Sequence, residues 1–529
     1  MYNGHKAEFL EELTSGSNED RKSKDFISKL AEKHGLRLSE AENIASFYTH
    51  SEGKVKVCRG LPCSLKSTGI ERELLAKYPD EELEDVSCLG YCDKAPVAWS
   101  QGKYYQLGNG GTKELEKQPY GSDFREVKDL KEFLELNGYE TLISFLKKNN
   151  RDEVLQMVND LNLRGFGGAG FPVYIKWKAV SASNEQKKFL LVNAHEGEPG
   201  TFKDRILMET NPYELLEASL IAALVVGADE IIIALKHEYL QAENTLKSAF
   251  EKSMDFFHSS GVDTALPKMR IMRVPGYYIT GEESALMEAI EGKRSEPRLR
   301  PPYPAEIGLF GKPTLIDNVE TLLYFLGRLR EYSKDGSKIP GTKSYCLTGD
   351  VKNPGAYILP YGSPALDLIS KKGGSNLSDL KAILPGGLSG GILTSAEGNV
   401  KLEFDSIKAH GAGMGTGSMI AISKDRCMVD VMDSIEEFFE RESCGKCMPC
   451  RYGTKELSSL FENLKHGEAT GKDIENAKRT ADVMMKGSIC GLGQASARMF
   501  LDSLKYFQEE LDEHVSGKCP SNVCFQEAR

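Results

Sequence analysis

The sequence has no apolar stretch long enough to span a bilayer. The longest candidate, residues 215–228, is too short and is interrupted by Glu217 and Ser219. The first residues are polar, so no secretory signal is expected. Basic residues do not outnumber acidic ones. The net charge is −11, which argues against a broad nucleic-acid-binding surface. These absences favour a cytoplasmic protein.

The rest of the composition is typical of a soluble chain with several domains. At 529 residues the chain is too long for one hydrophobic core. The expected order is a helical N-terminal segment, a small α/β unit, a larger α/β stretch, a β-rich segment and a helical C-terminal bundle. Within 188–274, strand and helix patterns alternate, which favours parallel strands joined by right-handed crossovers.

Cysteine spacing gives a specific signal near the C-terminus. In a reducing compartment, spaced cysteines are more often metal ligands than disulfide partners. Cys444, Cys447 and Cys450 form C-x2-C-x2-C, and Cys490 follows in a glycine-flanked turn. Four thiolates of this kind suit one four-iron cluster, whereas zinc sites favour paired C-x2-C knuckles. The pattern therefore favours iron–sulfur over zinc.

A second set of cysteines lies in the small N-terminal α/β unit. Cys58 and Cys63 form C-x4-C, and Cys88 and Cys92 form C-x3-C, at expected loop ends. Four thiolates there suit a two-iron cluster or a zinc ion, and spacing alone leaves both open. The remaining four cysteines have no recognisable partners. We expect Cys519 and Cys524 to be free, and Cys346 and Cys427 stand alone.

A glycine-rich loop at 164–171 is a candidate nucleotide site. Gly165, Gly167 and Gly170 fit G-x-G-x-x-G, and Lys176 could neutralise a phosphate. The preceding segment has the pattern of an amphipathic helix rather than a strand, so the dinucleotide fingerprint lacks its usual context. A tight packing turn is the competing interpretation.

Two further stretches carry acidic groups beside expected strands or helices. Asn193, Glu196 and Glu198 follow a strand, where α/β proteins bind ligands, and the carboxylates could accept hydrogen bonds from ribose hydroxyls while repelling a 2′-phosphate. His195 alone is more often an ordinary histidine than a base. At 275–292, Gly281 is expected to open a helix with Glu282 and Glu283 in its first turn. These glutamates either cap that helix or form a second pocket wall.

Together, six stretches resemble one family. They are RGFGGAGFP, NAHEGEPGTFKDR, YYITGEESALMEAIEG, PRLRPPYP, GLFGKPTLIDNVET and ESCGKCMPCRYGT with ICGLG downstream. The family is the NADH-binding flavoprotein component of respiratory complex I, with the diaphorase components of NAD-linked hydrogenases and formate dehydrogenases. Residues upstream, with the first two cysteine pairs, resemble the thioredoxin-like two-iron protein that partners this flavoprotein. The two are expected to be fused here.

The resemblance implies an α/β multidomain fold with FMN, NAD(H), a four-iron and a two-iron cluster. The implied domains are an N-terminal helical segment at 1–50, a thioredoxin-like two-iron domain at 51–118, a Rossmann-like FMN and NADH domain at 122–335, a ubiquitin-like β-grasp domain at 344–425 and a helical four-iron domain at 430–515.

Site residues carry over motif by motif. The implied cofactor-binding residues are Gly165, Gly167, Gly168, Gly170, Lys176, Asn193, Glu196, Glu198, Tyr278, Gly281, Glu282, Glu283, Tyr303 and Asn318. Tyr303 takes the place of a phenylalanine that stacks on the NADH base. Three positions depart from the family: Phe166 stands where an arginine is usual, His195 where an aspartate is usual, and Asp317 where an asparagine is usual.

The resemblance implies hydride transfer between NADH and FMN, then one-electron transfer through the clusters to a partner. No side chain need act as a general base. The same module run in reverse, reducing NAD⁺ with electrons from a formate dehydrogenase or hydrogenase partner, fits equally. A non-catalytic iron–sulfur scaffold or sensor and a zinc-stabilised assembly protein also stay open. No quinone pocket is recognisable, so further redox subunits are expected to hold the acceptor, and any membrane contact is expected to be indirect, on the cytoplasmic face.

Overall fold

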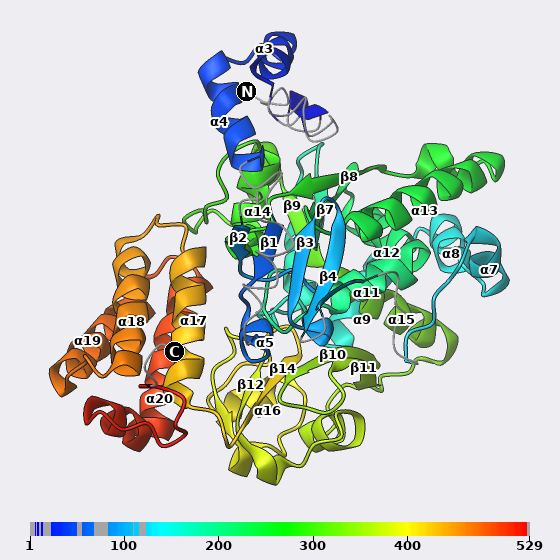
Figure 1. Cartoon of the computed structure of the whole chain (residues 1–529). Coiled ribbons are helices and arrows are strands. Elements are labelled where there is room, and N and C mark those ends of the chain that lie inside the picture. The colour runs from blue at the N-terminus through cyan, green and yellow to red at the C-terminus, as the bar shows by residue number, and fades with distance from the viewer. Residues whose placement is uncertain are drawn as a thin grey trace.

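The computed structural model describes residues 6, 8–9, 12–13, 23–49, 55–67, 83–108, 111–115 and 123–525. The segment 70–79 has a helical sequence pattern, and 109–125 is polar and glycine-rich as in a linker; the first and most of the second lie outside the described residues. Figure 1 shows the N-terminal helices at one end of the molecule and the C-terminal helical bundle beside a small sheet at the other end.

The N-terminal segment contains helices α3 (Lys24–Lys33) and α4 (Leu38–Thr49). The hydroxyl of Ser23 caps α3 by accepting from the N–H of Phe26, which satisfies one free amide of the first turn. Apolar residues such as Ile27 and Leu30 are buried in a cluster shared with the sheet of the larger α/β domain.

The first sheet has the order β2-β1-β3-β4-β5, with β1 and β2 parallel and the remaining pairs antiparallel. Two short helices, α5 and the 3₁₀ turn η1, carry cysteines beside it. The bounds are β1 (Val55–Cys58), α5 (Leu61–Ser64), β2 (Leu83–Val86), η1 (Cys92–Lys94), β3 (Val97–Ser100), β4 (Lys103–Gly108) and β5 (Gly111–Glu114).

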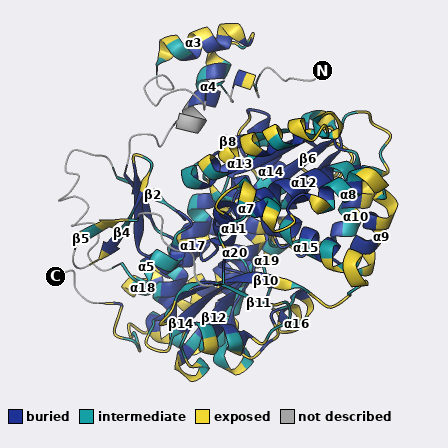
Figure 2. Cartoon of the chain, turned by 90° about the vertical axis from the view of Figure 1, so that its right-hand side faces the viewer, coloured by how far each residue is buried: buried dark blue, intermediate teal, exposed yellow. Residues whose placement is uncertain are grey.

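The larger α/β domain is built on a parallel sheet of order β8-β7-β6-β9. Strand β6 places Phe189 and Leu191 in the apolar cluster on one face and Leu190 and Val192 in the cluster on the other. Both faces are therefore covered, which explains why its strands are continuous apolar runs (Figure 2). The strands are β6 (Phe189–Ala194), β7 (Glu230–Lys236), β8 (Lys268–Val274) and β9 (Thr314–Asn318).

Helices on both faces of this sheet complete the domain. Helix α12 is buried almost all round, so its sequence is apolar without a polar stripe. The helix expected before the glycine-rich loop is present as α9. The bounds are α7 (Leu130–Glu135), α8 (Glu140–Lys148), α9 (Arg151–Asp160), α10 (Val173–Ser181), α11 (Lys203–Thr210), α12 (Pro212–Val226), α13 (Leu240–Ser259), η2 (Asp263–Ala265), η3 (Tyr278–Gly281), α14 (Glu283–Ile290), η4 (Leu309–Gly311) and α15 (Val319–Asp335).

The third sheet has the order β11-β10-β14-β12-β13. Its first strand, β10, and its last strand, β14, pair in parallel at the centre, and the remaining pairs are antiparallel, as expected for a β-grasp arrangement. The stretch 363–374 has the sequence pattern of a short helix and forms a π-helical turn, η5; a further helix, α16, lies before β14. The bounds are β10 (Thr342–Gly349), β11 (Gly355–Pro360), η5 (Asp367–Lys372), η6 (Leu377–Asp379), β12 (Leu380–Pro385), β13 (Leu393–Thr394), η7 (Ser395–Glu397), α16 (Phe404–Ala409) and β14 (Ser418–Ser423).

The C-terminal part is a bundle of four helices, as the sequence predicts. They are α17 (Met428–Glu442), α18 (Met448–His466), α19 (Gly471–Gly487) and α20 (Gly491–Val515). They share one apolar core that includes Phe439, Phe461 and Phe500. Among the residues that the structure describes, no helix has the length and apolar character needed to cross a bilayer.

Candidate functional site

The carboxyl ends of β6 and β9 meet at the point where the strand order reverses. The chain runs from β6 outward through β7 to β8, and then returns to place β9 on the opposite side of β6. Asn193, near the end of β6, and Asn318, at the end of β9, face each other in the register. Open α/β sheets bind ligands at this kind of position, because the loops that follow the two strands diverge there.

Each of the two asparagines is fixed by side-chain hydrogen bonds. Asn193 Nδ2 donates to the carbonyl of Gly281 at 2.9 Å. Asn318 Nδ2 donates to Asp204 Oδ2 at 2.6 Å, while its Oδ1 accepts from the N–H of Glu320 at 3.1 Å and caps α15. Their positions are therefore set by the protein before any ligand binds.

The glycine-rich loop lies against the end of β9. A Cβ added to Gly167 would stand 3.1 Å from Cβ of Asn318, and one added to Gly170 would overlap the ring of Phe404 at 2.6 Å. Gly168 has φ +134°, and its missing Cβ would meet nothing within 4 Å. The loop is thus closely packed at Gly167 and Gly170 but open at Gly168, so its backbone can approach a flat or anionic ligand. Gly165 makes only ordinary contacts, its N–H donating to Phe171 O at 2.9 Å.

Lys176 is paired with one of the residues that depart from the family. Its ammonium lies 2.6 Å from Asp317 Oδ1 and 2.5 Å from the carbonyl of Ile316. The second carboxylate oxygen of Asp317 accepts from Trp177 Nε1 at 2.6 Å. Asp317 therefore offsets the charge that Lys176 would offer to a phosphate.

Glu196 points into a buried charged network beside the loop. It accepts from the backbone N–H groups of Asp204 and Arg205 at 3.0 and 3.3 Å. Burial, and then the nearby Asp204 carboxylate, raise the pKa of Glu196 to about 7. In the same network, Lys203 Nζ lies 2.7 Å from Asp204 and 3.1 Å from Glu320. Lys203, Asp204 and Glu320 lie within the family motifs NAHEGEPGTFKDR and GLFGKPTLIDNVET, but they were not among the expected site residues.

Glu198 is held by contacts from two further segments. Tyr278 Oη donates to its carboxylate at 2.9 Å, and the N–H and hydroxyl of Ser389 donate at 3.0 Å each. Ser389 comes from the loop after β12, which the sequence pattern did not connect with this site. Burial raises the pKa of Glu198, and the three donors oppose this shift.

In the segment 278–283, the expected second wall of the nucleotide pocket, the helix begins later than expected. Gly281 ends the 3₁₀ turn η3, and α14 starts at Glu283. Glu282 is the N-cap and accepts from the N–H groups of Ser284 and Ala285. Arg300 pairs with both glutamates, at 2.5 Å from Glu282 and 2.9 Å from Glu283. The capping interpretation of Glu282 is therefore correct, and Glu283 begins the helix.

His195 and Tyr303 occupy opposite environments. His195 is buried, its Nε2 lies 3.0 Å from the carbonyl of Pro275, and its Nδ1 has no hydrogen-bond partner among the described residues. Burial lowers the pKa of His195 to about 3, so the ring is neutral. Tyr303 is 54% exposed, which leaves its ring available for stacking.

The first two cysteine pairs are brought together and buried. Cys88 Sγ and Cys92 Sγ lie 3.6 Å apart, and Cys58 and Cys63 are also buried. Contact with Cys58, together with burial, raises the pKa of Cys88 to about 12. Thiols of this kind stay protonated unless iron displaces the protons, so the donor set fits a two-iron cluster.

The two-iron cysteines lie against the loop that carries the acidic residues. The N–H of Gly200 donates to Cys92 Sγ at 3.3 Å. Lys236 Nζ donates to the carbonyl of Cys88 at 2.7 Å, and a buried ion pair between Lys56 and Glu238 measures 2.7 Å. The thioredoxin-like sheet is thus joined to the larger α/β domain through polar contacts beside the cluster ligands.

The four C-terminal cysteines surround one cavity. Cys444, Cys447, Cys450 and Cys490 line one small apolar pocket, together with Ile279, Pro297 and Leu492. Burial raises the pKa of Cys450 to about 12 and of Cys490 to about 11. An apolar pocket lined by four thiol groups fits a four-iron cluster. Ile279 belongs to the segment 278–283, so the expected wall of the nucleotide pocket also contacts the four cysteines.

Three family comparisons cover most of the chain. Residues 158–325 match the Nuo51 FMN-binding domain, residues 430–514 match the NADH-ubiquinone oxidoreductase-F iron-sulfur binding region, and residues 2–112 match the thioredoxin-like [2Fe-2S] ferredoxin.

Relatives that match over most of the chain agree with these results. The F 2 subunit of NADH-quinone oxidoreductase from Rhizobium meliloti is 36% identical over 72% of this chain and 94% of that protein. NADP-reducing hydrogenase subunit HndC of Solidesulfovibrio fructosivorans is 32% identical over 78% and 86%. A chain from the crystal structure of NAD⁺-reducing [NiFe]-hydrogenase in the H2-reduced state superposes with a TM-score of 0.82 at 28% identity, covering 96% of this chain and 93% of that one.

The fold, the two cysteine sets and these matches define an iron–sulfur flavoprotein oxidoreductase. The chain belongs to the family of NADH-quinone oxidoreductase F subunits, with a thioredoxin-like two-iron domain joined to it in the same polypeptide. The predictions of FMN, a four-iron cluster and a two-iron cluster are confirmed at the level of the family. The choice between iron and zinc at the first two cysteine pairs is thereby settled for iron.

Proposed function

We propose that FMN binds where β6 and β9 diverge, and that the chain passes electrons between a nicotinamide dinucleotide and its two clusters from that position. The proposal rests on one observation. Asn193 and Asn318 face each other where the strand order reverses, and the glycine-rich loop beside them has free space around Gly168. When bound, FMN supplies the conversion between two-electron hydride chemistry and one-electron transfer.

The chain's own residues bind and orient the reacting groups. The amides of the 165–170 loop would approach phosphate or ring, and Lys176 would supply a positive charge moderated by Asp317. Asn193 and Asn318 lie at the base of the proposed site, near the carboxyl ends of β6 and β9. His195 is neutral and the carboxylate of Glu198 is held by Tyr278 and Ser389, which suits a reaction that needs no general base.

Selection of NADH over NADPH is assigned to the carboxylate of Glu198. A buried acidic group near the ribose accepts hydrogen bonds from hydroxyls and repels a 2′-phosphate. Tyr278, Glu282, Glu283 and the exposed ring of Tyr303 form the side of the pocket where the dinucleotide would lie.

The contacts around the proposed flavin pocket indicate two routes by which electrons leave the flavin. One route passes through the wall at 278–283 to the four cysteines around Ile279. The second passes through Gly200 to Cys92. We assign the four-iron centre as the route toward partner subunits, and place the chain on the cytoplasmic side of whatever complex it joins.

The reverse direction is favoured by one observation. A chain from the NAD⁺-reducing [NiFe]-hydrogenase superposes on 96% of this chain with a TM-score of 0.82, so the likeness includes the thioredoxin-like part as well as the flavin and four-iron parts. We propose that the same pocket reduces NAD⁺ when a partner supplies low-potential electrons. Formation of NADH from NAD⁺ with reduced methyl viologen tests this directly, and its absence in flavin-loaded protein would contradict it.

The location of the flavin is tested by replacing the two asparagines. Asn318→Ser keeps a good helix cap but removes the amide, and Asn193→Ala removes the second amide. Both should lower flavin per chain at least tenfold while iron per chain is unchanged. Asn150→Ala, on the surface before α9, is the control. Normal flavin content in both pocket variants would place FMN elsewhere.

A further inference from the structure

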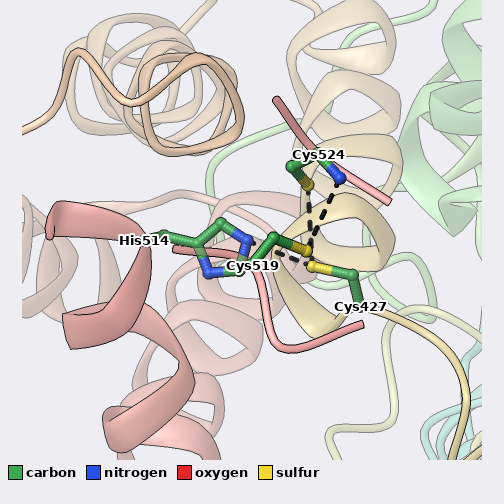
Figure 3. A group of neighbouring side chains, drawn as sticks. All are labelled: Cys427, His514, Cys519 and Cys524. Carbon is green, nitrogen blue, oxygen red and sulfur yellow. Dashed lines mark hydrogen bonds between the residues drawn. The ribbon is translucent and has the colours of Figure 1, made fainter. Parts of the chain in front are cut away.

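Four potential metal ligands from three segments meet at the end of the helical bundle. Cys427 precedes α17, His514 lies in the last turn of α20, and Cys519 and Cys524 lie in the turn that follows. Figure 3 shows their side chains pointing toward one another. Their ligand atoms all lie within 4.8 Å of one another. Cys427 was expected to stand alone, and Cys519 and Cys524 were expected to be free for want of further ligands; the structure brings the three together with His514.

Two distances among these atoms are close to those of a tetrahedral site. Cys427 Sγ lies 3.7 Å from Cys524 Sγ and 3.3 Å from His514 Nε2. A tetrahedral zinc ion with Zn–S of about 2.3 Å and Zn–N of about 2.0 Å separates neighbouring ligands by roughly 3.5–3.8 Å. These two contacts are already near this spacing, and the other ligand atoms lie within 4.8 Å of one another, so binding one ion requires only small side-chain movements.

The neighbouring groups hold the ligands in binding orientation. His514 Nδ1 lies 2.7 Å from the carbonyl of Glu510, a contact that places the proton on Nδ1 and leaves the lone pair of Nε2 facing Cys427. The backbone N–H groups of Val523 and Cys524 donate to Cys519 Sγ at 3.4 and 3.5 Å. Such amide–sulfur bonds stabilise a thiolate more than a thiol.

The surroundings are closed to solvent. His514 is fully buried, Cys427 and Cys524 are buried, and Cys519 is partly exposed. The ring of Phe525 lies against His514 with centroids 5.6 Å apart. Four protein ligands in a closed pocket leave no open coordination position, which is the arrangement of structural rather than catalytic zinc.

We propose that Cys427, His514, Cys519 and Cys524 bind one Zn²⁺ ion that fastens the C-terminal segment and the end of α20 to the start of α17. The site is separate from both iron–sulfur centres in its ligands and does not depend on the proposed position of FMN. Three thiolates and one imidazole favour zinc among divalent ions of the cell. Its role is to stabilise the bundle that carries the four-iron cysteines, without taking part in electron transfer.

The test is metal analysis of the full chain purified anaerobically with its clusters. We expect about one zinc per chain in addition to iron. Cys519→Ser, at the most exposed ligand, should lose that zinc and lower the melting temperature while keeping iron and flavin. Cys346→Ala, at a buried cysteine outside all three sets, should keep the zinc. Zinc that survives Cys519→Ser but disappears in Cys447→Ala would lie in the iron site and would overturn the proposal.

X-ray absorption at the zinc edge supplies a test that needs no variant. Three sulfur neighbours at about 2.3 Å and one nitrogen at about 2.0 Å are expected. Four sulfur neighbours would contradict the assignment, as would zinc-free protein from zinc-supplemented cells. A disulfide between Cys427 and Cys524, found by mass spectrometry of the native protein, would also overturn it.

Discussion

Tyr278 Oη lies 2.9 Å from a carboxylate oxygen of Glu198, and this hydrogen bond joins the two sides of the proposed nucleotide pocket. One side is the loop after β6, and the opposite side is the wall that continues to the four-iron cysteines. Because Ser389 also donates to Glu198, the carboxylate is fixed and its charge is held at one place. A fixed negative charge can discriminate between dinucleotides.

Replacing Glu198 by glutamine should shift the cofactor preference toward NADPH. The variant removes the charge but keeps a side-chain oxygen for Tyr278 and Ser389. We expect the ratio of kcat/KM for NADPH to that for NADH to rise about tenfold, equivalent to roughly 1.4 kcal/mol. Tyr278→Phe removes the hydrogen bond and keeps the charge, so its ratio should not rise. An unchanged ratio in Glu198→Gln would show that this carboxylate does not face the 2′ position.

Flavin binding should be far more sensitive at Gly168 than at Gly165. Gly168 has φ +134° and its Cβ would project into open space at the site, whereas Gly165 has only an ordinary contact at 3.5 Å. Gly168→Ala is therefore expected to lower flavin per chain severalfold through backbone strain and obstruction. Gly165→Ala is the matched control and should retain flavin. Equal flavin content in the two purified variants would contradict the assignment of this loop.

Removing the negative charge of Asp317, which pairs with Lys176, should raise the affinity for FMN. Asp317→Asn restores the residue usual in the family and still accepts from Lys176 or Trp177. The uncompensated ammonium would then attract a flavin phosphate more strongly, so FMN dissociation should slow by up to about tenfold. Lys176→Met should speed dissociation. Fluorescence of released flavin after dilution measures both rates, and a faster release from Asp317→Asn would contradict the prediction.

Glu436 in the bundle should make stability depend on pH. It is fully buried, accepts from Ser496 Oγ at 2.6 Å, and burial raises its pKa to about 8 from 4.5. Between these values the folded state holds a proton that the unfolded state has lost, so stability falls as pH rises toward 8 and is constant above it. Over two pH units in this window, the loss is about 3 kcal/mol.

Glu436→Gln should remove that dependence. The melting temperature of the variant relative to the wild type is expected to increase from pH 5.5 to pH 7.5. The exposed neighbour Glu437, changed to glutamine, should follow the wild type at both pH values. Parallel melting curves for Glu436→Gln and wild type would show that this carboxyl is not held neutral.

Local sequence patterns predicted many of the helices and strands. The reasons are physical, as three examples show. Strands β6 and β7 are apolar runs because both faces of the sheet are covered, and α12 is apolar all round because it is enclosed. The three close cysteines near the C-terminus predicted their cluster, because ligands that share a turn leave a short-range signature.

Several features depend on contacts between distant residues and left no local signal. Strand β9 is only five residues long and follows an irregular stretch with several prolines, so no periodicity marks it. Lys203 and Glu320 are far apart in the sequence but meet in a buried ion pair. Cys427 and His514 are likewise brought together by the packing of α17 against α20. The contacts of Ser389 with Glu198 arise between domains and could not be read from either segment alone.

An anaerobic titration with NADH tests the central claim most directly. The purified chain should contain FMN and about six irons, two from one cluster and four from the second. Added NADH should bleach the flavin absorbance and then the broader iron–sulfur absorbance. Protein that contains iron and flavin but shows no spectral change with NADH or NADPH would contradict the account of an NADH-oxidising module.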